Sequence, residues 1–278
     1  MVRPSIAMTC DLYQIGYDAA SLAKVEAAGF LLLDNMANPR PDWFEYWPIR
    51  KFLNDTVLDD NTWYGFFSPR FEEKTGLNSV GVQQVIANLE VTRPGLDVVL
   101  FSPQPDMGAF FLNVFEQGEM FHPGHMAVAK EVLRTLGFDA PIDTMVMDSR
   151  QIVFSNYFVA KPRFWRSWFK ITEAIFQMAE DTSHPLHAPL TTGTSYREGS
   201  HQKVFLVERI ASLLLTLQPE WRVASADTFS FAWSSFQSFN AKREWAYQSD
   251  ALKMAFRESG HPQYMEAYQS IRKNIGQP

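Results

Sequence analysis

Short apolar runs alternate with amphipathic segments along most of the chain. The runs at 5–10, 30–36, 62–68 and 97–103 have the length of buried strands, and a longer run at 151–162 is predicted as a further strand. The segments between the runs carry helical apolar spacing. Because buried strands that alternate with helices form parallel sheets covered on both faces, we predict an α/β fold.

The predicted helices have recognisable start and stop signals. Gly29 closes the first, Asn78 or Ser79 can cap another, and Pro162 begins a third. The predicted helical ranges are 19–29, 41–55, 78–90, two within 107–138 that are split by "HPGH", 162–181, 203–217, and a stretch from about 240 that is polar on one face.

Nothing in the pattern divides the chain into separate parts. No internal repeat or low-complexity linker interrupts the alternation, so residues 1–278 are predicted to form a single domain. Its α/β core covers about 1–225, and 226–278 form a mainly helical extension. A polar stretch rich in turn residues, 185–202, is predicted to be a loop long enough to serve a function.

Composition narrows the classes of function. The net charge of −6 argues against nucleic-acid binding through a general positive field. A single cysteine, Cys10, excludes an intrachain disulfide and a cysteine zinc cluster, and fits a reducing cytoplasm. The N-terminus lacks the pattern of a signal peptide, and no apolar run approaches the ~18 residues of a membrane helix. We therefore expect a cytoplasmic protein with no nucleic-acid partner.

Several familiar catalytic motifs are absent. The chain has no G-x-G-x-x-G, Walker A, H-E-x-x-H or G-x-S-x-G sequence, which disfavours dinucleotide oxidoreductases, P-loop ATPases, zincins and α/β-hydrolases. In "HPGH", His122 and His125 flank a Pro-Gly turn, with only Glu116 or Glu119 near enough in sequence to complete a metal site. We interpret both histidines as residues at helix ends.

In open α/β sheets, ligands bind beyond the carboxyl ends of the strands. Asp59 and Asp60 precede the strand at 62–68 and therefore lie at its amino edge, where Asp-Asp-Asn is ordinary turn chemistry. Arg70 follows the same strand at the edge where ligands bind. The positions that this rule selects are Thr9–Tyr13, Asp34, Asn35, Ser68–Arg70, Ser102–Asp106 and the loop before residue 203.

Four segments in this order resemble one protein family: "DWFEYWPIRKFL", "WYGFFSPRF", "FSNYFVAKPRFWRSWF" and "KVFLVERIASLLL". They are similar to bacterial glycosyltransferases of capsule and lipopolysaccharide synthesis, a group long described only as a domain of unknown function. The resemblance spans about residues 5–225. It implies a GT-A-like nucleotide-binding sheet, a nucleotide-sugar donor and a glycan or glycolipid acceptor.

The chain departs from the family at the end of the strand at 62–68. Where the family typically has His-Tyr-Arg-Arg, this chain has Ser68, Pro69, Arg70 and Phe71, so only the first arginine matches. The resemblance implies that Ser68 and Arg70 contact the donor, with Arg70 facing the diphosphate. The lost residues keep a second interpretation open, namely a catalytically inactive domain that binds a nucleotide or a sugar. A scaffold in a glycan assembly complex is a third.

The resemblance also assigns roles to polar residues in two other segments. Asn156 matches the asparagine that the family has before an apolar strand, and with Tyr157 it would face the sugar or the acceptor. Glu208 and Arg209 match a Glu-Arg pair on an apolar helix. Glu208 would be the general base and Arg209 would contact the donor, whereas the alternative is a buried structural ion pair.

The donor's nucleotide and any metal ion are assigned more loosely. Thr9, Asp11 and Asp34 are the predicted contacts to the nucleotide. No D-x-D follows a strand, so the sequence favours a fixed cation over a metal, although Mn²⁺ or Mg²⁺ with Asp106 as a ligand stays an alternative. An acceptor at the inner face of the membrane would imply peripheral attachment, for which no basic amphipathic helix argues. Trp165 lies three residues from Trp168 on one helix face; the pair could form a platform for the acceptor, but core packing is favoured.

Overall fold

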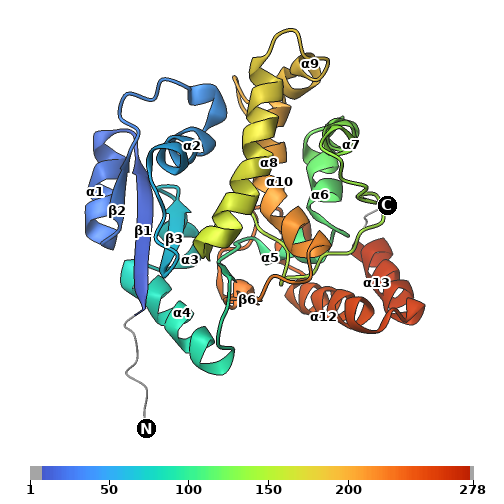
Figure 1. Ribbon diagram of the computed structural model, residues 1–278. Helices are drawn as coiled ribbons and strands as arrows, with labels where there is room; N and C mark the ends of the chain where they lie inside the picture. Colours follow the sequence, from blue (N-terminus) through green and yellow to red (C-terminus); the bar gives the residue numbers. More distant parts are fainter. Residues whose placement is uncertain (1–7, 276–278) are drawn as a thin grey trace.

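The computed structural model describes residues 8–275. Six strands form one sheet in the order β2-β1-β3-β5-β4-β6, in which β5 is antiparallel to both of its neighbours and the other pairs are parallel. Helices flank the sheet, and a helical pair follows it at the C-terminal end (Figure 1). The strands are β1 (Thr9–Gly16), β2 (Leu31–Asp34), β3 (Thr62–Phe67), β4 (Val98–Leu100), β5 (Phe158–Ala160) and β6 (Val223–Ser225).

The predicted α/β class is confirmed, and so are most helices. Gly29 ends the first helix in the left-handed conformation, and the Asn78 side chain accepts a hydrogen bond from Gly81 N. The helices are α1 (Ala19–Ala28), α2 (Tyr46–Asp55), α3 (Phe71–Thr75), α4 (Ser79–Thr92), α5 (Pro105–Ala109), α6 (Val114–Phe121), α7 (His125–Thr135), α8 (Pro162–Glu180), α9 (His187–Thr191), α10 (Gln202–Leu217), α11 (Gln237–Asn240), α12 (Arg243–Ser259) and α13 (Pro262–Ile275), with 3-10 turns η1 (Pro41–Trp43) and η2 (Thr228–Ser230).

Two expectations about strands are wrong. The strand predicted at 5–10 is β1, which begins at Thr9 and runs to Gly16, while residues 5–7 lie outside the described part. The long strand predicted at 151–162 is only Phe158–Ala160, because the residues before it form turns. The chain leaves β4 and returns beside its end, where Leu100 pairs with Phe158, so β5 must run back antiparallel and the sheet is mixed rather than parallel.

Side chains alternate across β3 and build a core on each face of the sheet. Trp63 and Phe67 pack with α1, α3 and α4, whereas Tyr64 and Phe66 pack with α2, α8 and α10. Trp165 on α8 is fully buried, and its Nε1 donates to Tyr64 O at 2.9 Å. Trp168 is likewise fully buried, so the core assignment of both tryptophans is confirmed.

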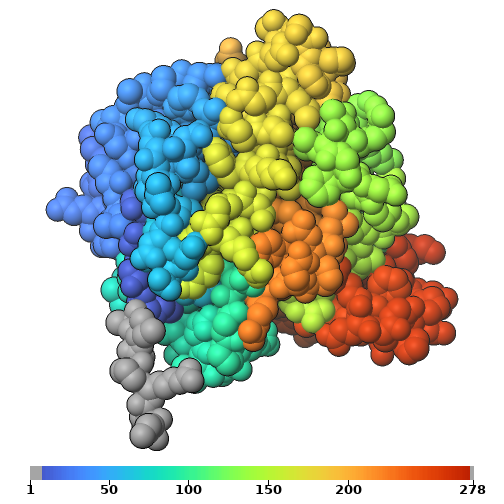
Figure 2. All heavy atoms as spheres, in the orientation of Figure 1, coloured from blue at the N-terminus to red at the C-terminus, as the bar shows by residue number. Residues whose placement is uncertain are grey.

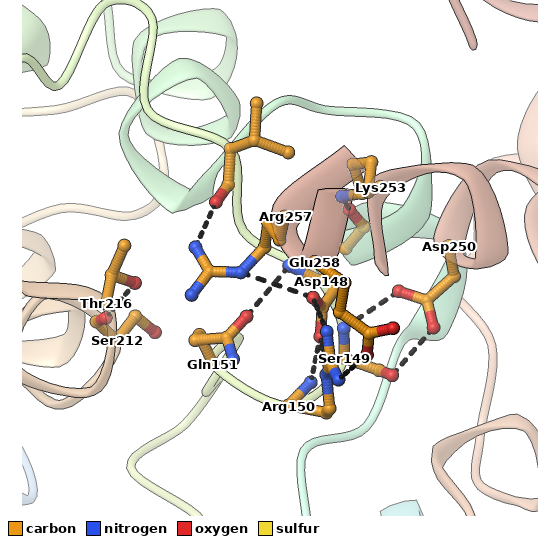
Figure 3. Close-up of polar contacts among 12 residues, drawn as sticks. Asp148, Ser149, Arg150, Gln151, Ser212, Thr216, Asp250, Lys253, Arg257 and Glu258 are labelled. Atoms are coloured by element: carbon orange, nitrogen blue, oxygen red, sulfur yellow. Dashed lines mark hydrogen bonds and ion pairs between the residues drawn. The ribbon is translucent and has the colours of Figure 1, made fainter. Parts of the chain in front are cut away.

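The C-terminal helices α12 and α13 confirm the predicted helical extension and form one corner of the molecule (Figure 2). Charged groups attach them to the core (Figure 3). Asp148 is fully buried and pairs with Arg150 at 2.9 Å, and Ser149 N and Oγ donate to Asp250 of α12. Lys253 Nζ donates to two backbone carbonyls, and burial lowers the pKa of its ammonium to about 8.

Candidate functional site

A layer of buried polar side chains lies where β1 and β3 end. Gln14 is 1% exposed, and its Nε2 donates to Ser68 O at 3.1 Å. Ser68 follows β3, and its Oγ lies 2.5 Å from the hydroxyl of Tyr157, which is fully buried. These contacts join the ends of two parallel strands to the turn that precedes β5, so the layer forms the base of the candidate site.

The turn before β5 has an unusual backbone. Ser155 and Asn156 both have positive φ, 59° and 52°, a conformation that is rare for side-chain-bearing residues and is often found at functional sites. It aims Ser155 N at Glu208, whose Oε1 accepts its hydrogen bond at 2.5 Å. The buried Asn156 Oδ1 has no hydrogen-bond partner within the described residues. A buried amide oxygen without a partner costs free energy unless water or a ligand supplies a donor.

Glu208 and Arg209 have different surroundings although they are neighbours on α10. The Glu208 side chain is 24% exposed, and its Oε2 lies 3.6 Å from the Arg209 guanidinium. The Arg209 side chain is only 4% exposed and donates to Val114 O, Phe205 O and Gln117 Oε1. Arg209 therefore holds α10 against α6, whereas the Glu208 carboxylate stays partly exposed.

Lys74 brings a cation to Glu208 from α3. Its Nζ donates to Ser155 Oγ at 2.9 Å and lies 5.4 Å from the centre of the Tyr157 ring. Burial lowers the pKa of the Lys74 ammonium, and the charge of Glu208 opposes that shift. Ser155 therefore contacts both groups, its backbone N the carboxylate and its hydroxyl the ammonium.

Glu45, directly before α2, supplies a second carboxylate to this cluster. The surrounding protein raises the pKa of its carboxyl group, chiefly by desolvation, and the negative charge of Glu208 adds to the rise. Lys74 acts in the opposite direction. Glu45 is exposed, and within residues 8–275 its side chain makes no ion pair or hydrogen bond with another residue. A carboxylate that has a raised pKa and is accessible to solvent is a candidate for chemistry.

A charged network fixes the segment that carries Glu45. Asp42 of η1 accepts hydrogen bonds from Lys203 at 2.5 Å and from Arg40, and Arg40 also pairs with Glu180. Burial alone would raise the pKa of Asp42, but these hydrogen bonds outweigh it and hold the pKa at about 2. The segment that leads to Glu45 is thus held against α8 and α10.

The predicted nucleotide contacts Thr9 and Asp11 lie at the wrong edge. They pair with Thr62 and Tyr64 at the start of β3, so they occupy the amino edge of the sheet, away from the site. The error follows from the position of the strand, because β1 begins at Thr9 instead of ending near it. The expected placement of these two residues at the ligand-binding edge is corrected accordingly.

Asp34, Ser68 and Arg70 do lie at the carboxyl edge, as expected from the strand pattern. Asp34 is exposed, and its Oδ1 accepts a hydrogen bond from Met36 N at 2.9 Å. The Arg70 side chain is 58% exposed and forms a surface ion pair with Glu73 at 2.7 Å. The Arg70 guanidinium can therefore bind a ligand only if its ion pair with Glu73 breaks.

Asp106, which the sequence offers as an alternative metal ligand, is engaged by a neighbouring serine. Buried Asp106 accepts hydrogen bonds from Ser234 N, at 3.0 Å, and from Ser234 Oγ, so its carboxylate is occupied by a local contact. In the part of the chain that the structure describes, no three acidic, histidine or cysteine side chains come together as a metal site. Asp59 accepts from Asn61 N, and Asp60 pairs with Arg166, as expected of a turn.

The two histidines of "HPGH" are buried and neutral. Burial and the charge of Arg209 lower the pKa of His122 to about 4 and that of His125 to about 3. His122 stacks on Phe205, and His125 Nδ1 lies 3.0 Å from Gln202 Oε1. Their interpretation as helix-end residues is confirmed, since His122 caps α6 and His125 begins α7.

These histidines predict a pH effect on stability. Between about pH 6.5 and pH 5 the unfolded chain takes up protons on both rings while the folded chain does not. The free energy of unfolding should therefore fall on acidification, by at most about 1.4 kcal/mol per pH unit for each histidine. Urea unfolding across this range checks it. His125→Gln should reduce the fall, whereas the exposed control His261→Gln should leave it unchanged.

Glu45, Lys74 and Gln14 were missed by the sequence analysis. Glu45 left one signal, a carboxylate inside the aromatic run "DWFEYW". Lys74 left another, since it follows Arg70 by four residues in a segment that begins at the carboxyl edge. Gln14 interrupts the apolar positions of β1, but nothing in the sequence indicates its partner Ser68.

The chain has no match among protein families, and its fold is similar to that of a solved structure. No family model and no curated protein matches the chain. Among solved structures it is similar to the apo form of "WbbM bifunctional glycosytransferase", with 12% sequence identity and a TM-score of 0.46. The match covers 78% of this chain and 44% of that one, so this chain spans less than half of that protein's length. No helix within residues 8–275 is both long and apolar enough to span a bilayer.

Proposed function

We propose that the chain is a glycosyltransferase that moves a sugar from a nucleotide-sugar donor to a bacterial surface polysaccharide or lipopolysaccharide acceptor. The observation that carries this proposal is the meeting of Glu208 and Lys74 on the two sides of Ser155, at the edge of the sheet where ligands bind. The ordered resemblance of four sequence segments to such enzymes supports it.

In the proposed reaction the bond between the sugar's anomeric carbon and the diphosphate breaks. A new bond forms between that carbon and an acceptor hydroxyl, whose proton passes to Glu208 as general base. The hydrogen bond from Ser155 N fixes Oε1 of Glu208 and leaves Oε2 to take the proton. Lys74 would balance the negative charge that grows on the leaving diphosphate, with Arg70 once it leaves Glu73.

The remaining residues of the site position the substrates in this proposal. Asn156 Oδ1 would accept a hydrogen bond from a sugar hydroxyl, which would satisfy an oxygen that otherwise has no partner. Tyr157 is fully buried, and its hydroxyl is engaged by Ser68, so we assign it to holding the turn and not to direct contact with sugar. The acceptor would be presented at the inner face of the membrane.

A nucleotide-binding domain without catalysis is the second candidate. It is favoured by the ion pair between Arg70 and Glu73, which occupies the one arginine that matches the family run. Both candidates predict a nucleotide site, but only the transferase predicts turnover.

The proposal is tested by thermal unfolding with nucleoside mono- and diphosphates and nucleotide sugars, with and without Mn²⁺. A nucleotide at 100 times its dissociation constant should stabilise the fold by about 2.7 kcal/mol. Stabilisation together with sugar release or transfer from one donor supports the transferase. Stabilisation without turnover on a complete donor and acceptor panel supports the silent domain, and no stabilisation by any nucleotide overturns both.

A further inference from the structure

Arg197 is an exposed arginine beside the site that no part of the proposed reaction uses. It lies in loop 192–201, between α9 and α10. Its guanidinium carbon is 3.8 Å from the centre of the Phe44 ring. Within residues 8–275 it forms no ion pair. The Arg197 side chain therefore contacts Phe44, the residue before Glu45. No carboxylate within residues 8–275 neutralises its charge.

The base of the loop is fixed, and its tip is exposed. Gly193 and His201 form an antiparallel bridge, Thr194 N donates to Ser200 O at 2.8 Å, and Gln202 N donates to Thr192 O at 3.0 Å. Residues 195–199 are exposed, and Gly199 turns the chain with φ of 76°. Such a loop holds Arg197 over the site while leaving its long side chain free to change partners.

Phe44, whose ring the Arg197 guanidinium contacts, has an uncommon backbone conformation. Its backbone has φ of 47° and ψ of −132°, which is uncommon for a residue with a bulky side chain. The network around Asp42 holds this segment in place on one side, and α2 begins on the other. The conformation turns the Phe44 ring toward the loop, so that residues about 150 positions apart in sequence meet beside Glu45.

The positive charge of Arg197 acts on the same titratable groups as the charges of Arg70 and Lys74. The charges of Arg197 and Arg70 both act on the hydroxyl of Tyr17, which follows β1, and both lower its pKa against a larger rise from burial and Asp18. Arg197 and Lys74 both oppose the raised pKa of Glu45. Arg197 and Lys74 therefore both act on Glu45, and neither of them forms an ion pair with a carboxylate within residues 8–275.

We propose that Arg197 is a further phosphate-binding cation beside Lys74 and Arg70, which leaves the Phe44 ring to grip the diphosphate of the donor and makes the site prefer a diphosphate over a single phosphate. This inference rests on the proposed function and deepens it. A guanidinium can bind two phosphate oxygens in a bidentate fork, which stacking on an aromatic ring cannot match in strength once an anion is present. Lys74 from the opposite side would contact the remaining oxygens.

The test measures dissociation constants for a nucleoside diphosphate and the matching monophosphate, by calorimetry on the full chain. Arg197→Ala should weaken binding of the diphosphate about tenfold or more and of the monophosphate less than about threefold, because one charge-assisted contact is lost. Arg197→Lys should restore part of the affinity. Arg93→Ala is the matched control, since Arg93 is also exposed and forms no ion pair within residues 8–275.

The outcomes separate this inference from the proposed function. Wild-type binding of a diphosphate with no loss in Arg197→Ala overturns the role of Arg197 and leaves the transferase standing. Equal losses for diphosphate and monophosphate also overturn it, because they indicate a disturbed loop instead of a lost phosphate contact. Absence of binding in the wild type defeats the proposed function itself. Farnesyl diphosphate serves as the lipid probe, and its tighter binding in an Arg197-dependent manner would contradict the assignment to the donor.

Discussion

Replacing Glu208 by Gln is expected to lower the rate of sugar transfer at least about a hundredfold, since a general base contributes roughly 10²- to 10⁴-fold. The amide keeps the shape of the side chain, and its oxygen can still accept the hydrogen bond from Ser155 N. It cannot take up the acceptor's proton. The turnover number with saturating donor should therefore fall, while the dissociation constant of the nucleotide stays close to the wild-type value.

The control for Glu208→Gln is Glu26→Gln. Glu26 is exposed on α1, and its side chain makes no hydrogen bond or ion pair within residues 8–275, so this change should leave turnover within about twofold of the wild type. Near-normal turnover in Glu208→Gln would contradict the assigned base. Glu45→Gln then decides whether the second carboxylate performs that role. If both variants turn over normally, deprotonation by a carboxylate of this cluster is excluded.

The two carboxylates differ in a way that makes this comparison informative. Glu208 is anchored by the backbone N–H of Ser155, whereas Glu45 has no hydrogen bond to another described residue and has a raised pKa. A carboxylate that a backbone N–H holds in place suits proton removal from a hydroxyl, and one whose pKa is raised suits holding a proton. If Glu45 is protonated during the reaction, it can donate a hydrogen bond to the sugar, so its replacement should raise KM more than it lowers kcat.

Strands could be predicted from the sequence where an apolar, buried run also has an extended backbone. The run "TWYGFF" is buried at every position, and it is the strand β3. The run "IVFSNYF" is just as apolar but forms a turn, because Ser155 and Asn156 adopt positive φ and return the chain into β5. Apolar character reports that a segment is buried, and it does not report whether the buried backbone is extended.

The site was predictable only where a residue's position relative to a strand end decides its place. That rule placed Ser68 and Arg70 at the correct edge, and it misplaced Thr9 because the start of β1 was wrong. Glu45 and Lys74 were not found because their importance comes from neighbours far away in sequence. Glu208, for example, meets Ser155 across 53 residues, and no periodicity in the sequence specifies that meeting.

The C-terminal helices provide a second large expected effect, on stability. Replacing Asp148 by Ala should lower the free energy of unfolding by about 3–5 kcal/mol, the usual cost of removing one partner from a buried ion pair. Asp148 is fully buried and accepts three hydrogen bonds from Arg150, and the Arg257 guanidinium lies 3.4 Å away (Figure 3). Without the carboxylate, the partly buried Arg257 guanidinium loses its ion pair, and Arg150 keeps only its pair with the exposed Glu258. Urea unfolding with fitted m-values measures the loss.

Asp143→Ala is the matched control, because Asp143 forms an exposed ion pair with Lys130 and should contribute at most about 0.5 kcal/mol. A loss below about 1 kcal/mol in Asp148→Ala would mean that the cluster does not anchor α12. The segment that unfolds first is a more specific readout than the total loss of stability. Arg257 and Asp250 both lie on α12, so limited proteolysis should cut Asp148→Ala first within 243–275. The sheet edge that carries Glu208 should stay protected, because its hydrogen bond to Ser155 does not involve α12.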